Sequence, residues 1–320
     1  MPRNKTTIEN ILTHDKGSSD AQFRHLEKQV ATLTEALAQT RAAKFKIPTQ
    51  RARSSKRGAF VRFFLPDTHG ACVDEICLSA ILADLEYLQP REIFLMGDHL
   101  DCKGGFLAPH QPPTFIEEIE TNFADDVSAA NEMIDAVQTA APKAAIKYLE
   151  GNHEERIERW ILKQTSRIPG DAVFLRNLCG PEAVLHLQKR NIPYISKART
   201  YDDCPVQGTV KAGRCYVTHG TSHGRNAAAQ MLARFAGPVV FGHVHKLLSC
   251  TDRTVAGGTI GAWSVGCASQ LQPLWRHGSP TDWQHGYGFQ VVQPDGEFTH
   301  LNVPVVAGRT LLKTLGQLLT

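Results

Sequence analysis

The sequence has no stretch approaching the ~20 consecutive apolar residues that span a bilayer, which argues against a transmembrane helix. No basic cluster followed by an apolar segment comes after Met1, so we expect no secretory leader, a cytoplasmic location and no membrane partner. The eight cysteines include no Cys-x-x-Cys pair, which argues against a zinc knuckle or a redox centre. In a chain of 320 residues we expect reduced, mostly buried thiols and no disulfide framework.

Acidic residues are missing from one segment, and that segment is strongly basic. The formal net charge is only +3, yet seven basic residues lie between positions 41 and 57: Arg41, Lys44, Lys46, Arg51, Arg53, Lys56 and Arg57. In the rest of the chain the acids outnumber the bases. The segment is either a solvated linker or a contact for a polyanion such as nucleic acid.

The N-terminal part of the chain has a short helical stripe. Its apolar positions step by three and four: Phe23, Leu26, Val30, Leu33 and Leu37. The stripe fits a helix that packs on its own globular domain, or one that forms a homodimeric coiled coil through residues 23–37. Pro48 ends any such helix. We therefore expect residues 1–58 to be a helix and a basic linker, and residues 59–320 to form the main domain.

The main domain is predicted to be an α/β structure. Strands are expected at 60–65, 92–96 and 144–149, with helices at 73–87 and 114–140 between them, which indicates parallel βαβ units. The acids of 114–140 are interpreted as a solvated face: Glu117, Glu118, Glu120, Asp125 and Asp126. A further helix is expected at 154–163. The second half is richer in strands, at 199–217, 238–241 and 249–305, with a helix at 226–235 and a turn at Asp295-Gly296.

Potential metal ligands follow five of these strands. They come as Asp67-Thr68-His69, Gly97-Asp98-His99-Leu100-Asp101, Gly151-Asn152-His153-Glu154, Thr218-His219-Gly220 and Gly242-His243-Val244-His245. Open α/β sheets place their sites at the carboxyl ends of strands, and we expect Gly151 to supply a positive φ at its turn. Carboxylate and imidazole suit zinc, manganese, iron and nickel. Two Asp, one Asn and four His could hold two ions if one carboxylate bridges them.

The five motifs, in this order, resemble those of the calcineurin-like metallophosphoesterases. The resemblance runs from Asp67 to His245, and the stretch Trp283-Gln284-His285-Gly286 is similar to that of phage-borne members. It implies a layered α/β/β/α sandwich, to which the helix and linker expected in residues 1–58 would be an N-terminal extension. It also implies two divalent ions (Mn, Fe, Zn or Ni, with Mn favoured) that share a hydroxide able to attack a phosphate ester.

The resemblance also assigns roles. One ion would take Asp67, His69, Asp98 and His245, and the other Asp98, Asn152, His219 and His243. His153 would be the general acid for the leaving oxygen, the alternative being a histidine that only fixes Asn152 or Asp67. Asp101 is expected to orient a ligand imidazole or its own loop. His223 either reaches substrate or caps a loop.

The expected substrate follows from one position at which this sequence differs from the protein phosphatases of the family. Protein phosphatases of this superfamily carry Asp-Arg-Gly where this chain has Asp101-Cys102-Lys103, which argues against a protein phosphatase. We expect a phosphodiesterase or nuclease acting on nucleic acid or nucleotides. The alternatives are a phosphomonoesterase on small esters and a non-catalytic binding scaffold. Trp275, His277, Trp283 and His285 cluster in a Gly-rich stretch, where they either stack bases or pack under the sheet.

Overall fold

The computed structural model describes residue 28 and residues 58–102, 122–166, 169–202, 204–255, 258–273 and 278–312. Several predictions made from the sequence fall outside these ranges: the basic segment 41–57, the stripe at 23–37 apart from the helical Lys28, and residues Trp275 and His277. In the part of the chain that is described, no helix combines the length and apolar character needed to cross a membrane.

The first sheet has six strands in the order β11-β10-β1-β2-β3-β4. Strands β1 (Phe60–Leu65), β2 (Glu92–Leu95), β3 (Ala145–Leu149) and β4 (Tyr194–Ile195) run parallel to one another. Strand β10 (Gly286–Val292) pairs antiparallel with β1, and β11 (Phe298–Pro304) pairs antiparallel with β10 and completes the sheet. The expected parallel βαβ units are confirmed, and Asp295-Gly296 forms the expected turn between β10 and β11.

The second sheet has five strands in the order β5-β6-β7-β9-β8. They are β5 (Thr209–Ala212), β6 (Cys215–Thr218), β7 (Val239–Phe241), β8 (Leu247–Thr254) and β9 (Gly258–Val265). Parallel pairing joins β6 to β7 and β7 to β9, so these strands direct their carboxyl ends to one edge. Ligands that follow β6 and β7 therefore share that edge.

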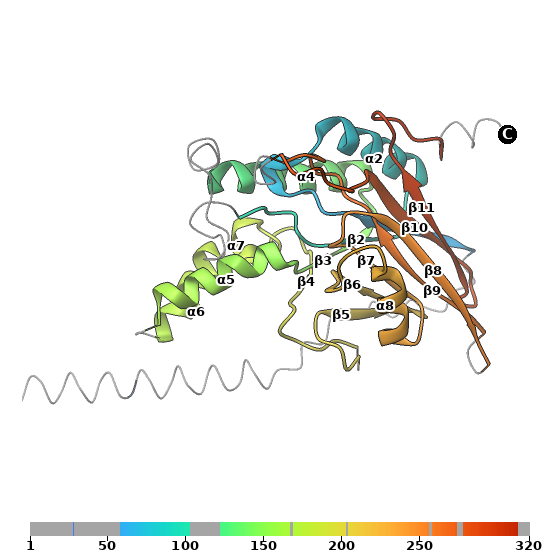
Figure 1. The fold of residues 1–320 in the computed structure, drawn as a ribbon. Coiled ribbons are helices and arrows are strands. Elements are labelled where there is room, and N and C mark those ends of the chain that lie inside the picture. The colour runs from blue at the N-terminus through green and yellow to red at the C-terminus, as the bar shows by residue number, and fades with distance from the viewer. Residues whose placement is uncertain are drawn as a thin grey trace, which may run out of the picture.

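The helices and the two sheets form four layers (Figure 1). Between the sheets lies a core to which both contribute, including Phe64, Phe94 and Leu149 from the first and Val217 and Val240 from the second. Helices α2 (Glu75–Leu88) and α4 (Phe123–Ala140) contribute to a core on the outer face of the first sheet, and α8 (Ala227–Phe235) to one on the second. The expected α/β/β/α sandwich is confirmed.

Some elements differ from the prediction. Helix α4 begins at Phe123 because Asn122 has an extended backbone and its side chain accepts a hydrogen bond from the Asp125 N–H, so it caps the helix. A continuous helix over 114–140 is therefore wrong. Between β3 and β4 the chain forms α5 (Asn152–Gln164), α6 (Pro169–Cys179) and α7 (Pro181–Val184), of which the sequence predicted only the first. A short 3-10 helix, η1 (Gly70–Cys72), follows β1.

The cysteines agree with expectation. All eight are free thiols, and five of them are buried: Cys77, Cys102, Cys204, Cys215 and Cys267.

Candidate metal centre

The five strand-end motifs meet at one place, where the carboxyl ends of β1, β2, β3, β6 and β7 converge. Three groups of side chains there could each hold a metal ion, with their ligand atoms within 4.8 Å of one another. The groups are Asp67, His69 and His245; His69, Asp98 and His153; and Asp98, His219 and His243. All of these residues except the partly buried His243 are buried.

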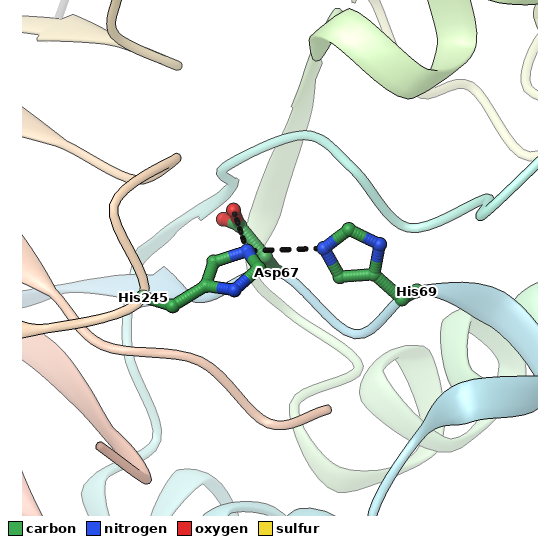
Figure 2. A group of neighbouring side chains, drawn as sticks. All are labelled: Asp67, His69 and His245. Atoms are coloured by element: carbon green, nitrogen blue, oxygen red, sulfur yellow. Dashed lines mark hydrogen bonds and ion pairs between the residues drawn. The ribbon is translucent and has the colours of Figure 1, made fainter. Parts of the chain in front are cut away.

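The first group lies between the ends of β1 and β7 (Figure 2). His245 Nε2 is 3.1 Å from Asp67 Oδ2 and 3.0 Å from His69 Nε2, so three potential ligand atoms face one another. The other carboxylate oxygen, Asp67 Oδ1, is buried and has no hydrogen-bond partner among the described residues. Such an orphaned acceptor is costly unless a cation balances it.

The group formed by Asp98, His219 and His243 lies around Asn152. His219 Nε2 is 3.2 Å from Asp98 Oδ2 and 3.1 Å from Asn152 Oδ1. His243 Nδ1 is 2.8 Å from the same Asn152 oxygen. The structure thus places all seven predicted ligands in two adjoining sets. Asp98 stands between the sets because it is also grouped with His69.

The hydrogen bonds of His219 indicate which of its nitrogens can bind a metal. His219 Nδ1 lies 2.8 Å from the Met96 carbonyl oxygen, which can only accept, so Nδ1 carries a proton. Nε2 faces the oxygens of Asp98 and Asn152, which also only accept. A second proton or a metal ion must therefore lie between them. The donor set of imidazoles, carboxylates and one amide fits a divalent metal ion.

Burial and neighbouring charges shift the pKa values of the Asp and His side chains in the centre. Burial alone would raise the pKa of Asp98, but the His219 and His153 imidazoles beside it hold that pKa well below its usual value. Burial would lower the pKa of His219, and the carboxylate of Asp98 instead raises it to about 9. Burial lowers the pKa of His243 to about 3, so that ring is neutral and its nitrogens remain available as ligands.

Four of the seven predicted ligands have a left-handed backbone. The φ angles are 57° at His69, 51° at Asp98, 69° at His243 and 55° at His245. Residues with a Cβ rarely adopt this region, and each instance costs on the order of 1 kcal/mol or more. The fold accepts this cost at four positions around one centre, which is where strained backbones concentrate when a site dictates side-chain direction.

Gly151 differs from the sequence prediction. Its φ is −89°, so it does not supply the expected positive φ. A Cβ there would instead lie 2.0 Å from Asp98 Oδ1 and 2.4 Å from the Asp98 nitrogen. Glycine is needed because the strand end after β3 passes directly against Asp98, not because of its backbone angle.

Glu154 organises the loop that carries Asp98, a role the sequence reasoning missed. Its Oε2 accepts from the N–H groups of Asp98 and Gly151, both at 2.9 Å. Its Oε1 accepts from the N–H groups of His99 at 2.8 Å and Leu100 at 3.1 Å, and from the Tyr148 hydroxyl at 2.7 Å. The signal was present, because an acid three residues after a helix N-cap typically binds the cap's N–H.

Asp126 corrects the prediction of a fully solvated acidic face. It is only 4% exposed and accepts hydrogen bonds from the N–H groups of Cys102 at 2.8 Å and Ala71 at 3.0 Å. It therefore ties α4 to the loops after β1 and β2. Asp125 is exposed, as predicted, and Glu117, Glu118 and Glu120 lie outside the described residues.

Asp101 lies beside two imidazoles. Its Oδ1 is 2.8 Å from His69 Nδ1 and 3.2 Å from His153 Nδ1. The His153 Nδ1 also donates to the Asp101 carbonyl oxygen at 2.7 Å. These contacts leave Nε2 of each ring directed toward the centre, and His153 Nε2 lies 4.0 Å from Asp98 Oδ2.

Three further residues that the sequence analysis singled out, His223, Trp283 and His285, lie near the metal centre or contact its surroundings. His223 is exposed, and its Nδ1 lies 3.0 Å from His243 Nε2, so it adjoins the group that contains His243. The Trp283 ring stands against His245 with ring centroids 4.1 Å apart. His285 Nε2 donates to the Ser269 carbonyl oxygen at 2.8 Å. Trp283 and His285 therefore pack against the protein itself.

Fold and site together define an α/β/β/α protein with a buried Asp/His centre able to bind metal at its strand ends. No family model and no curated protein matches the sequence. Among solved structures the chain is similar to Vacuolar Protein Sorting 29 from Cryptosporidium parvum, with 12% identity and a TM-score of 0.38 over 79% of this chain and 95% of that chain. A likeness at this level carries no inference about activity.

Proposed function

We propose that the protein is a binuclear metallophosphoesterase. The observation that carries the proposal is the place of Asp98, which is grouped with His69 on one side and with His219 and His243 on the other. A carboxylate in that position can serve two ions at once, and paired ions are suited to in-line displacement at phosphorus. Manganese is our preferred metal, with iron, zinc and nickel as alternatives.

The ions would supply Lewis acidity and activate the attacking water. Asp67, His69 and His245 would hold one of them, Asn152, His219 and His243 the other, and Asp98 both. The chain's own contribution to proton transfer is His153, whose Nδ1 is fixed by the Asp101 carbonyl and whose Nε2 is directed toward the centre. A proton held at that Nε2 can pass to the leaving oxygen.

We further propose a phosphodiester or nucleotide as the substrate. The loop after β2 supports this choice, because Cys102 stands where related protein phosphatases have arginine. The thiol of Cys102 is buried, and burial raises its pKa well above the usual value, so the thiol is neutral. Unlike an arginine, it offers no positive charge with which to bind a phosphorylated side chain. A small phosphomonoester is the second candidate, and a panel of model esters separates the two.

The test is Asp98→Asn, with Asp171→Asn on the exposed surface of α6 as the matched control. Metal content is measured by elemental analysis, and turnover is measured on bis(nitrophenyl) phosphate, nitrophenyl phosphate and a dinucleotide. We expect the Asp98 variant to lose both metal occupancy and turnover, since one bridging charge disappears, whereas the control keeps both. An Asp98 variant that binds two ions and turns over at the parent rate would refute the proposal.

A further inference from the structure

The guanidinium of Arg156 lies at the edge of the metal centre, one helical turn after Asn152 on α5. Its Nη2 is 3.2 Å from His153 Nε2, and its Nη1 donates to the Asp101 carbonyl oxygen at 3.0 Å. A guanidinium only donates, so His153 Nε2 accepts from Arg156 while it is unprotonated, and Arg156 is released from it when Nε2 holds the proton proposed for the leaving oxygen. In the proposed mechanism, contact with His153 Nε2 places Arg156 on the leaving-group side of the centre.

Arg156 carries a charge without a carboxylate partner among the described residues. One turn further along the same helix, Arg159 binds the carboxylate of Glu155 at 2.7 Å. Within the described part of the chain its contacts are with a carbonyl oxygen and an imidazole nitrogen, which accept hydrogen bonds but carry no negative charge; the contacts of Arg156 are these two. A guanidinium has five N–H donors in a planar fork, and this arrangement suits the oxygens of a phosphate.

We propose that Arg156 determines specificity by binding a second phosphate, the one attached to the leaving group of an oligonucleotide strand. This inference rests on the proposed phosphoesterase function. In a minimal diester the group beyond the leaving oxygen is uncharged, whereas in a nucleic-acid strand the neighbouring nucleotide carries another phosphate. A half-buried cation beside His153 Nε2 distinguishes these substrates, because it gains a charge-assisted, bidentate partner only in the second.

The experiment uses the metal-loaded full chain and three trinucleotides of one sequence. The first has two ordinary phosphate linkages, and each of the others has one linkage replaced by an uncharged, uncleavable methylphosphonate. In one analogue the neutral linkage lies on the leaving-group side of the remaining cleavable bond, and in the other it lies on the opposite side. The leaving alcohol has the same chemistry in all three, so demand for the general acid is matched.

We expect the parent to lose about 10- to 100-fold in kcat/KM on the leaving-side analogue alone, as for one or two charge-assisted hydrogen bonds. Arg156→Gln should abolish that difference, Arg156→Lys should retain part of it, and the control Arg159→Gln should keep all of it. Competitive inhibition by thymidine 3′,5′-bisphosphate relative to thymidine 5′-monophosphate gives a second readout that needs no turnover, and Arg156→Gln should remove the preference for the bisphosphate.

Two results would overturn the role of Arg156. One is a parent that cleaves all three substrates equally well, and the other is an Arg156→Gln variant that keeps the parent's discrimination. An Arg156→Gln variant slowed equally on all three would show that the arginine acts only by holding His153. Failure of the proposed function looks different, because a metal-loaded parent would then cleave no phosphate ester at all.

Discussion

Replacing Glu154 by glutamine should show how much the Asp98 loop depends on one buried carboxylate. The carboxylate accepts five hydrogen bonds, two at Oε2 and three at Oε1, and the side chain is fully buried. Glutamine has nearly the same shape, but its amide nitrogen is a donor. Whichever way the amide turns, at least two N–H or O–H donors meet another donor.

The magnitude follows from that geometry. A hydrogen bond to a charged group contributes about 1.5–3 kcal/mol, so the loss of two gives a destabilisation of roughly 3–6 kcal/mol. Part of this loss falls on the N–H of Asp98, whose left-handed backbone the carboxylate supports. We therefore expect the affinity for metal to fall as well, because Asp98 no longer has a fixed position.

The assay is urea denaturation of the metal-free protein, followed by elemental analysis after reloading with manganese. The control is Glu155→Gln at the next position, where the carboxylate is 30% exposed and pairs with the exposed Arg159. Exposed ion pairs contribute about 0–1 kcal/mol, so this control should remain close to the parent. Equal stability losses in the two variants would show that the five hydrogen bonds do not support the loop.

Three further predictions concern chemistry, nucleic-acid binding and pH. His153→Ala should slow a nucleotide ester by ~10²–10⁴-fold and an activated nitrophenyl ester far less, with metal content unchanged; equal losses on both would indicate a structural histidine. Deleting residues 1–57 should leave turnover of a small diester intact but make the log-log salt dependence of DNA binding shallower, by ~0.7–0.9 per lost phosphate contact, and an unchanged slope would make the basic segment a linker. Burial lowers the pKa of His300 from 6.5 to about 4, so its neutral ring contributes stability that is complete above pH 6.5 and is lost as the pH falls toward 4. That loss is about 3 kcal/mol, and His300→Gln should flatten this part of the stability curve in denaturation experiments, whereas a curve identical to the parent's would contradict the shift.

The sequence predicted the parts of this structure that depend on local pattern. The strand at 60–65 matches β1, and the helices expected at 73–87 and 226–235 match α2 and α8 to within two residues at each end. The ligand motifs could be placed because each follows an apolar strand, and parallel strands end at a common edge. Their convergence followed from topology, without any knowledge of side-chain contacts.

What the sequence could not predict depends on contacts between distant segments. Nothing in the local pattern of Gly151 indicates that Asp98 lies against its Cα, and nothing near Asp126 indicates that Cys102 and Ala71 donate to it. Helix α6 was missed although its composition permits a helix. The pattern of apolar residues within one segment does not show which of them pack against the rest of the protein. That no described carboxylate pairs with Arg156 is likewise a fact of three-dimensional arrangement.

The left-handed backbones of His69, Asp98, His243 and His245 bear on how the protein can be engineered. In the metal-free chain, glycine at any of these positions would relieve backbone strain and remove a ligand in the same step. Selection for thermal resistance in a chelating medium would therefore favour variants that have lost the centre. Directed evolution of this scaffold should be carried out with metal present, so that the binding energy of the ion offsets the backbone strain. Selection for thermal stability then no longer removes the ligands that activity needs.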